Sequence, residues 1–113
     1  MSELTKQKCV PFESDSPPMM ENEIEDYLQE VPEWDVVEVE GVQRLKRTFK
    51  FKNFAEALDF TNKVGEIAEE QGHHPVIELT WGRATVQWWT HDIKGLHNND
   101  FIMAAKTSEI YEG

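Results

Sequence analysis

The sequence predicts a single α+β domain, a four-stranded antiparallel sheet with three helices packed on one face, in the order α-β-β-α-β-β-α. Two pairs of segments alternate apolar and polar residues, as half-buried strands do. Each pair is followed by a segment with helical periodicity, and another helix precedes the first pair. With 113 residues the chain can build one core but not two.

Composition excludes several classes of protein. The net charge of −11 argues against a nucleic-acid surface, which needs clustered Lys and Arg. Cys9 is the single cysteine, so no intramolecular disulfide can form. No apolar stretch approaches the 18 or so residues of a membrane span, and the N-terminus lacks a signal-peptide core. We therefore expect a cytoplasmic protein without membrane contact.

The first residues divide into a tail and a helix. Residues 1–17 have no periodicity and many turn-forming residues, so we expect a flexible tail before a domain at 18–113. A short helix is expected at about residues 18–30, with Ser16 as its cap and prolines in its first turn. Pro32 prevents its continuation.

The stretch "WDVVEVEGVQRLKRTFKF" predicts two strands around a turn at Glu40-Gly41. In the second strand Leu45 and Phe49 share the apolar parity, while the other parity is largely polar. Arg47 interrupts the apolar parity, so we expect this strand to end or bend there.

The central helix is predicted by its two ends. Asn53 is a good N-cap, with Glu56 three residues later to complete a capping box. Gly72 is placed to end the helix in the left-handed conformation. Gly65 is unfavourable inside a helix, and we interpret it as close packing on the sheet. The apolar flank comprises Phe54, Ala57, Leu58, Phe60, Val64, Ile67 and Ala68.

The second hairpin follows Pro75, with a turn expected at Gly82-Arg83. Parity predicts that Trp81 and Trp88 belong to the core, which leaves Trp89 as the tryptophan free to stack on a flat ligand. The last helix is expected at about residues 99–111, capped by Asn98 or Asn99.

Histidines dominate the candidate site. His73 and His74 follow the end of the central helix, where they could exchange protons near neutral pH. Glu69 lies one helical turn before His73 and could steady it. The alternative is a helix-terminal turn with exposed imidazoles.

Other polar residues have similar alternatives. His91 closes the second hairpin and does not share the parity of the residues expected in the core, and His97 is expected to be solvated. Asp100 opens the last helix, where an acid favours the helix dipole whether or not it is catalytic. The spacing H-H-x16-H matches no common zinc pattern, so we expect no metal site.

The arrangement "EEQGHHP", then "WWTHDIKGL", then "NNDFIMAA" resembles the pterin-4a-carbinolamine dehydratases. That family has an acid four positions before His-His-Pro, an aromatic residue further on, a later histidine and then an aspartate. The matching residues are Glu69, His73, His74, Pro75, Trp81, His91 and Asp100.

The resemblance implies an enzyme, a dehydratase that converts 4a-hydroxytetrahydropterin to quinonoid dihydropterin and water. It recycles the pterin cofactor of aromatic amino-acid hydroxylases, and itself needs no metal or cofactor. We assign proton transfer to His73 and His91 and substrate holding mainly to His74, with Glu69 and Asp100 in support. The resemblance also implies substrate contacts by Gly72, Trp89, Thr90 and Asp92; animal members carry an acid at the Gly72 position and a small hydroxyl residue at the Trp89 position.

The same resemblance leaves a second class of function open. Animal members also act as dimerisation cofactors of a transcription factor, so a non-catalytic interaction or regulatory module is the alternative. A functional link to phenylalanine hydroxylase is a further expectation. We expect a homodimer or homotetramer, because the apolar surface of Trp89, Phe101, Ile102, Met103 and Ile110 is hard to bury within one small domain.

Overall fold

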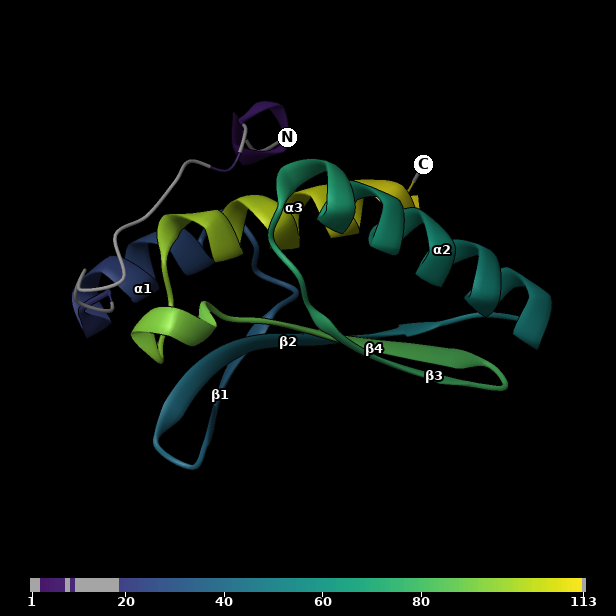
Figure 1. Cartoon of the computed structure of the whole chain (residues 1–113), viewed down its shortest axis with the longest axis horizontal. Helices are drawn as coiled ribbons and strands as arrows, with labels where there is room; N and C mark the ends of the chain where they lie inside the picture. The colour runs from purple at the N-terminus through teal and green to yellow at the C-terminus, as the bar shows by residue number, and fades with distance from the viewer. Residues whose placement is uncertain (1–2, 8, 10–18, 113) are drawn as a thin grey trace.

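A computed structural model describes residues 3–7, 9 and 19–112, without the side chain of Asp92. Three α-helices lie on one side of a four-stranded antiparallel sheet, which confirms the predicted fold class and element order (Figure 1). The strand order across the sheet is β1-β2-β4-β3. The elements are η1 Glu3–Lys6, α1 Glu21–Leu28, β1 Asp35–Val39, β2 Val42–Lys50, α2 Phe54–Gln71, β3 Val76–Thr80, β4 Arg83–Trp88, η2 His91–Ile93 and α3 Asn98–Glu112. Within the described ranges, no helix combines the length and the apolar character that crossing a membrane requires.

The turn of the first hairpin lies at Glu40-Gly41, as predicted. Both residues have positive φ, 52° and 81°. This pair of left-handed residues joins two strands whose last and first residues, Val39 and Val42, are directly paired. Such two-residue turns match the natural twist of a hairpin.

Arg47 does not end or bend β2, contrary to the sequence expectation. The strand runs on to Lys50, and Arg47 lies on the core side of the sheet opposite Val86. Its guanidinium stacks 4.5 Å from the Phe49 ring centroid and donates to Ser108 Oγ at 2.8 Å. A long side chain can bury its stem this way while its polar head finds a partner, so the apolar parity tolerates it.

Asn53 and Gly72 lie at the two ends of α2 as the sequence predicts, and of the expected capping box the described structure shows the Asn53 half. Asn53 Oδ1 accepts a hydrogen bond from the Glu56 backbone N–H at 2.9 Å. At the other end Gly72 adopts the left-handed conformation, with φ 67° and ψ 27°. Ala57, Phe60, Val64 and Ala68 of the predicted flank are buried, whereas Phe54 and Leu58 remain exposed.

Gly65 does not serve close packing, so that interpretation is wrong. A Cβ placed on Gly65 would have no neighbouring atom within 4 Å. The residue lies in the middle of α2 with helical geometry and open space beside it.

We therefore expect Gly65→Ala to stabilise the protein by about 0.5–1 kcal/mol, because alanine loses less backbone entropy than glycine in a helix. The matched control is Gly72→Ala, at the other glycine of this region. There the positive φ makes alanine unfavourable, and we expect a destabilisation of about 1 kcal/mol. Urea unfolding of the two variants would check both signs; a loss of stability in Gly65→Ala would contradict the first.

The second hairpin corrects two expectations. Its turn lies at Trp81-Gly82, one residue before the predicted position, because β4 begins at Arg83. Trp81 does not reach the core: it is 70% exposed at the tip of the hairpin. Trp88, in contrast, is fully buried as predicted.

The helix α1 is shorter than predicted, and its expected cap Ser16 lies outside the described residues. Met20 occupies the N-cap position, and its backbone N–H donates to Glu23 Oε1 at 3.0 Å. The chain leaves α1 at Leu28, before Pro32.

Helix α3 is buried over its first two-thirds and Ile110 is partly buried, which leaves little of the apolar surface on which the oligomer expectation was based. Phe101, Ile102 and Met103 are each at most 1% exposed. The segment η1 packs on α3, with Leu4 only 3% exposed in the core (Figure 1). Flexibility of residues 1–17 as a segment stays a prediction, and so does the oligomer.

Candidate active site

The chain turns inward at His73 because of Gly72. The left-handed Gly72 reverses the backbone at the end of α2, and the His73 N–H donates back to Ala68 O at 3.2 Å. His73 is thereby only 8% exposed, and its ring stacks on Trp88 at 5.8 Å between centroids and 10° between planes. The local turn therefore buries one of the two adjacent histidines.

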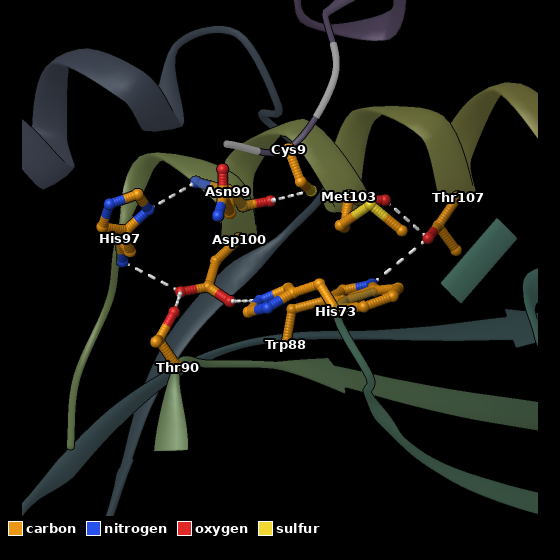
Figure 2. A network of polar contacts seen from close by, with 9 residues as sticks. All are labelled: Cys9, His73, Trp88, Thr90, His97, Asn99, Asp100, Met103 and Thr107. Carbon is orange, nitrogen blue, oxygen red and sulfur yellow. Dashed lines mark hydrogen bonds and ion pairs between the residues drawn. The ribbon is translucent and has the colours of Figure 1, made fainter. Parts of the chain in front are cut away.

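Asp100 is the centre of the site's hydrogen bonds (Figure 2). Its side chain is fully buried, and Oδ1 lies 2.6 Å from His73 Nε2. Oδ2 accepts from Thr90 Oγ1 and from the His97 backbone N–H, both at 2.9 Å. A carboxylate can only accept, so His73 carries a proton on Nε2, and in the neutral ring Nδ1 is then the acceptor nitrogen. This is how a carboxylate orients an imidazole for proton transfer.

Asp100 also helps to start α3, in which it is the third residue. Its bond to the His97 N–H is one half of a capping box. The His97 side chain also caps the helix, because Nδ1 accepts the N–H of the second helical residue, Asn99, at 3.0 Å. His97, rather than Asn98 or Asn99, therefore caps α3, and it is partly buried rather than solvated. The spacing His97-x-x-Asp100 could have signalled this, since an acid at the third position is typical of a capping box.

The capping role of His97 gives an expected pH dependence. The pKa of His97 is lowered from its usual 6.5, and burial is the largest cause. The charge of Asp100 opposes this by raising the pKa, and His73 adds a smaller lowering effect. Stability linked to neutral His97 is therefore complete above pH 6.5 and is lost as pH falls through the lowered pKa. We expect the free energy of unfolding to fall between pH 7 and pH 5 more in the wild type than in His97→Asn, since asparagine caps without titrating. Urea unfolding at both pH values measures this; equal losses in the two proteins would contradict it.

His74 and Glu69 form a separate, exposed pair. His74 Nε2 lies 3.3 Å from Glu69 Oε2, and the side chains are 60% and 81% exposed. The sequence expectation that Glu69 steadies His73 is wrong, because the reversal at Gly72 takes His73 off the helical spacing. Exposed pairs of this kind contribute about 0–1 kcal/mol.

His91 lies at the end of the second hairpin and is exposed. Its ring contacts the Trp89 ring at 4.4 Å between centroids. The preceding Thr90 is 1% exposed and exchanges backbone hydrogen bonds with Gly95, which closes the loop. Because the Thr90 hydroxyl also donates to Asp100, His91 lies next to the network that holds His73.

Trp89 is not free to stack on a ligand, contrary to the sequence expectation. It is 7% exposed, and the Arg44 guanidinium lies 3.8 Å above its ring. Trp81 lies at the opposite end of β4 and takes no part in the cluster. Asp92 belongs to η2, and its side chain is outside the described part of the structure.

Cys9 lies beside the same network (Figure 2). Its Sγ is 4.0 Å from Asn99 O, and its backbone N–H donates to Gln71 Oε1 at 2.9 Å. Burial, together with the charge of Asp100, raises the pKa of the Cys9 thiol to about 11. The thiol therefore stays protonated at neutral pH and is a poor nucleophile.

No metal cluster is visible in the described residues, since no three His, Cys, Asp or Glu side chains lie grouped there as ligands would. The histidines also lie away from two hollows of about 730 Å³ each. One is lined by the start of α2 and Tyr111, the other by residues 29–33 and the end of α3. We locate the site by its chemistry, because hydrogen-bonded imidazoles and a buried carboxylate are what proton transfer requires.

The fold and this cluster define an α+β domain in which a buried imidazole is hydrogen-bonded to a buried carboxylate. Residues 17–110 match the family model described as pterin 4 alpha carbinolamine dehydratase. The chain belongs to this family, as the sequence resemblance predicted.

Bacterial relatives agree over the whole length. A Saccharophagus degradans protein, provisionally named pterin-4-alpha-carbinolamine dehydratase, is 54% identical and covers 100% of both chains. A Microcystis aeruginosa protein with the same provisional name is 52% identical, over 98% of this chain and 96% of its own.

Two solved structures are similar in fold. A Brucella melitensis protein described as transcriptional coactivator/pterin dehydratase has a TM-score of 0.75 and 31% identity, over 83% of this chain and 98% of its own. A pterin dehydratase-like protein described as a RuBisCO assembly factor in the alpha-carboxysome has a TM-score of 0.59 and 18% identity, over 69% and 88%. The second similarity concerns the fold alone.

Proposed function

We propose that the protein dehydrates 4a-hydroxytetrahydropterin to quinonoid dihydropterin, and so recycles the pterin cofactor of aromatic amino-acid hydroxylases. The observation that carries this proposal is the Asp100–His73 pair, with exposed His91 next to the residue that bonds the same carboxylate. Family membership supports the substrate class.

The reaction needs one proton added and one removed. Loss of hydroxide from C4a needs a proton donor, and a proton must leave a pterin nitrogen as the quinonoid double bond forms. We assign the base to His73, because its Nε2–H donates to Asp100 and leaves Nδ1 to accept. We assign the acid to His91, whose imidazole is exposed.

The other predicted site residues are given supporting parts. His74, exposed beside Glu69, would hold the substrate. Thr90 would act through Asp100, since its hydroxyl is already bonded there. Contacts of Gly72, Trp89 and Asp92 with the substrate remain proposals from family resemblance.

The deciding experiment is a dehydratase assay on freshly generated carbinolamine, monitored by absorbance of the quinonoid product. It should be run on untreated and chelator-treated protein, because a reaction that only moves protons needs no metal. Acceleration by both preparations over the spontaneous reaction supports the proposal. If neither preparation accelerates the reaction, the proposal is contradicted.

An interaction role is the second candidate. Trp81 at the tip of the second hairpin and Phe54 and Leu58 at the start of α2 are 70%, 43% and 39% exposed, which leaves large apolar side chains available to a partner. Such surfaces could serve a homodimer or homotetramer, or a partner such as a hydroxylase. Retained binding to a partner by a His73, His74 and His91 triple variant would favour this role over catalysis.

A further inference from the structure

Trp89 is buried on the side of the sheet that the helices leave uncovered. Its neighbour Trp88 faces the core, so Trp89 lies on the opposite face of this chain segment. Even so, Trp89 is only 7% exposed. Its ring contacts are the Arg44 guanidinium at 3.8 Å and the His91 ring at 4.4 Å, tilted by 36°. A single indole thus touches both an arginine and a candidate catalytic histidine.

Arg44 is held in one orientation by its surroundings. It lies in β2, paired with Val37 of β1, and its Nη1 donates to Gln87 Oε1 at 3.3 Å. Its Nε is buried without a hydrogen-bond partner among the described residues. Burial of an unpartnered N–H is unfavourable, and stacking of the guanidinium on Trp89 is the contact that offsets it.

Within the described part of the chain, the His91 backbone carbonyl accepts the Lys94 N–H at 3.2 Å, and the recorded contact of its imidazole is the Trp89 ring. The residue is exposed and begins η2, a 3-10 helix of three residues. Trp89 is the aromatic ring against which its imidazole packs. If Trp89 turned, His91 would lose that support, and misplacement of a catalytic group by about 1 Å can cost about 100-fold in rate.

We propose that Arg44 is a positioning residue for the dehydration, which acts by clamping Trp89 and thereby holding the His91 imidazole. The inference rests on the proposed function, in which His91 transfers a proton. Arg44 itself is not a catalytic residue, because its contacts are with Trp89 and Gln87.

Four variants test this clamp. Arg44→Ala removes it, Arg44→Met retains an apolar side chain of similar length without the charge, and Arg44→Lys retains a cation that can stack less well. Lys46→Ala is the matched control, because Lys46 is a cation on the same face of β2, opposite Gln87 on the neighbouring strand. Thermal unfolding followed by circular dichroism identifies any variant that is not folded at the assay temperature.

Two readouts are needed for each variant. In steady-state assays we expect Arg44→Ala to lower kcat on the order of tenfold, with a smaller change in KM. Arg44→Met should lower kcat less than Arg44→Ala does, and Arg44→Lys should keep part of the activity that Arg44→Ala loses. Lys46→Ala should have the kcat of the wild type. In NMR spectra the ring current of Trp89 should displace the His91 ring C–H resonances. In Arg44→Ala these resonances should move toward those of exposed His74.

The outcomes separate this inference from the proposed function. His91 resonances in Arg44→Ala that match those of the wild type would overturn the clamp, whatever happens to kcat. A displaced His91 signal with unchanged kcat would overturn the positioning role. No turnover by the wild-type protein would overturn the proposed function, whereas the His91 resonances still report whether Arg44 holds the ring.

Discussion

Replacement of His91 by alanine should lower turnover of the carbinolamine by about 10²–10⁴-fold, the usual contribution of a general acid or base. The fold should be unaffected, because His91 is exposed and makes its ring contact at the surface of Trp89. Steady-state kinetics together with thermal unfolding would measure both effects.

His74→Ala provides the matched control for this prediction. His74 is also exposed and also carries an imidazole, but we assign it to substrate holding. Its loss should therefore raise KM more than it lowers kcat. Near-normal kcat in His91→Ala would remove His91 from the proton-transfer step.

Replacement of Asp100 by alanine should damage both stability and activity. The change leaves three donors without their acceptor: His73 Nε2–H, the Thr90 hydroxyl and the His97 backbone N–H. Each unsatisfied buried donor costs about 1–3 kcal/mol, and we expect a total loss of about 3–5 kcal/mol. Activity should fall by about 10²–10⁴-fold as well, because His73 loses the group that orients it.

Asp100→Asn separates the two effects. The amide keeps one acceptor oxygen and the shape of the side chain, so stability should fall less than in the alanine variant. It no longer enforces the proton on His73 Nε2, so activity should still fall strongly. Glu109→Ala on the same helix is the control, since Glu109 is exposed and the change should stay within about 0.5 kcal/mol. Urea unfolding and kinetics are the measurements; an Asp100→Ala protein as stable as wild type would contradict this account.

The sequence predicted most of the fold because the residues that end its helices and form its turns act over a few positions. Asn53 and Gly72 mark the ends of α2 through hydrogen bonds and backbone conformations within a few residues. The pair Glu40-Gly41 similarly determines the first hairpin. Such signals need no knowledge of tertiary packing.

The predictions that failed concern residues whose position depends on a partner far away in the sequence. Arg47 remains in its strand because Ser108, 61 residues later, accepts its hydrogen bond. Trp89 is buried because Arg44 covers it, which parity alone cannot reveal. The interpretation of Gly65 was wrong for a different reason: no neighbouring atom lies within 4 Å of the position that its Cβ would take.

The candidate site was predicted as a set of residues but not as a set of partners. Asp100 could be named from the resemblance, yet its bonds to His73, Thr90 and His97 join three separate segments. The assignment of Glu69 to His73 failed because one left-handed residue, Gly72, changed the direction of the chain. Pairings across segments depend on the assembled fold.

The packing of Leu4 against α3 extends the packed core of this protein beyond the range that the family model matches. The family model begins at residue 17, whereas Leu4 is 3% exposed within the core. Lys106 Nζ donates to Thr5 O at 3.0 Å, and Cys9 N–H donates to Gln71 Oε1, one residue before the turn that delivers His73. A chain trimmed to the matched range would therefore carry a vacancy over α3 comparable to a large-to-small core substitution. A boundary set at the start of the family match would cut through a packed interior, whereas the bacterial relatives match the chain through this segment as well.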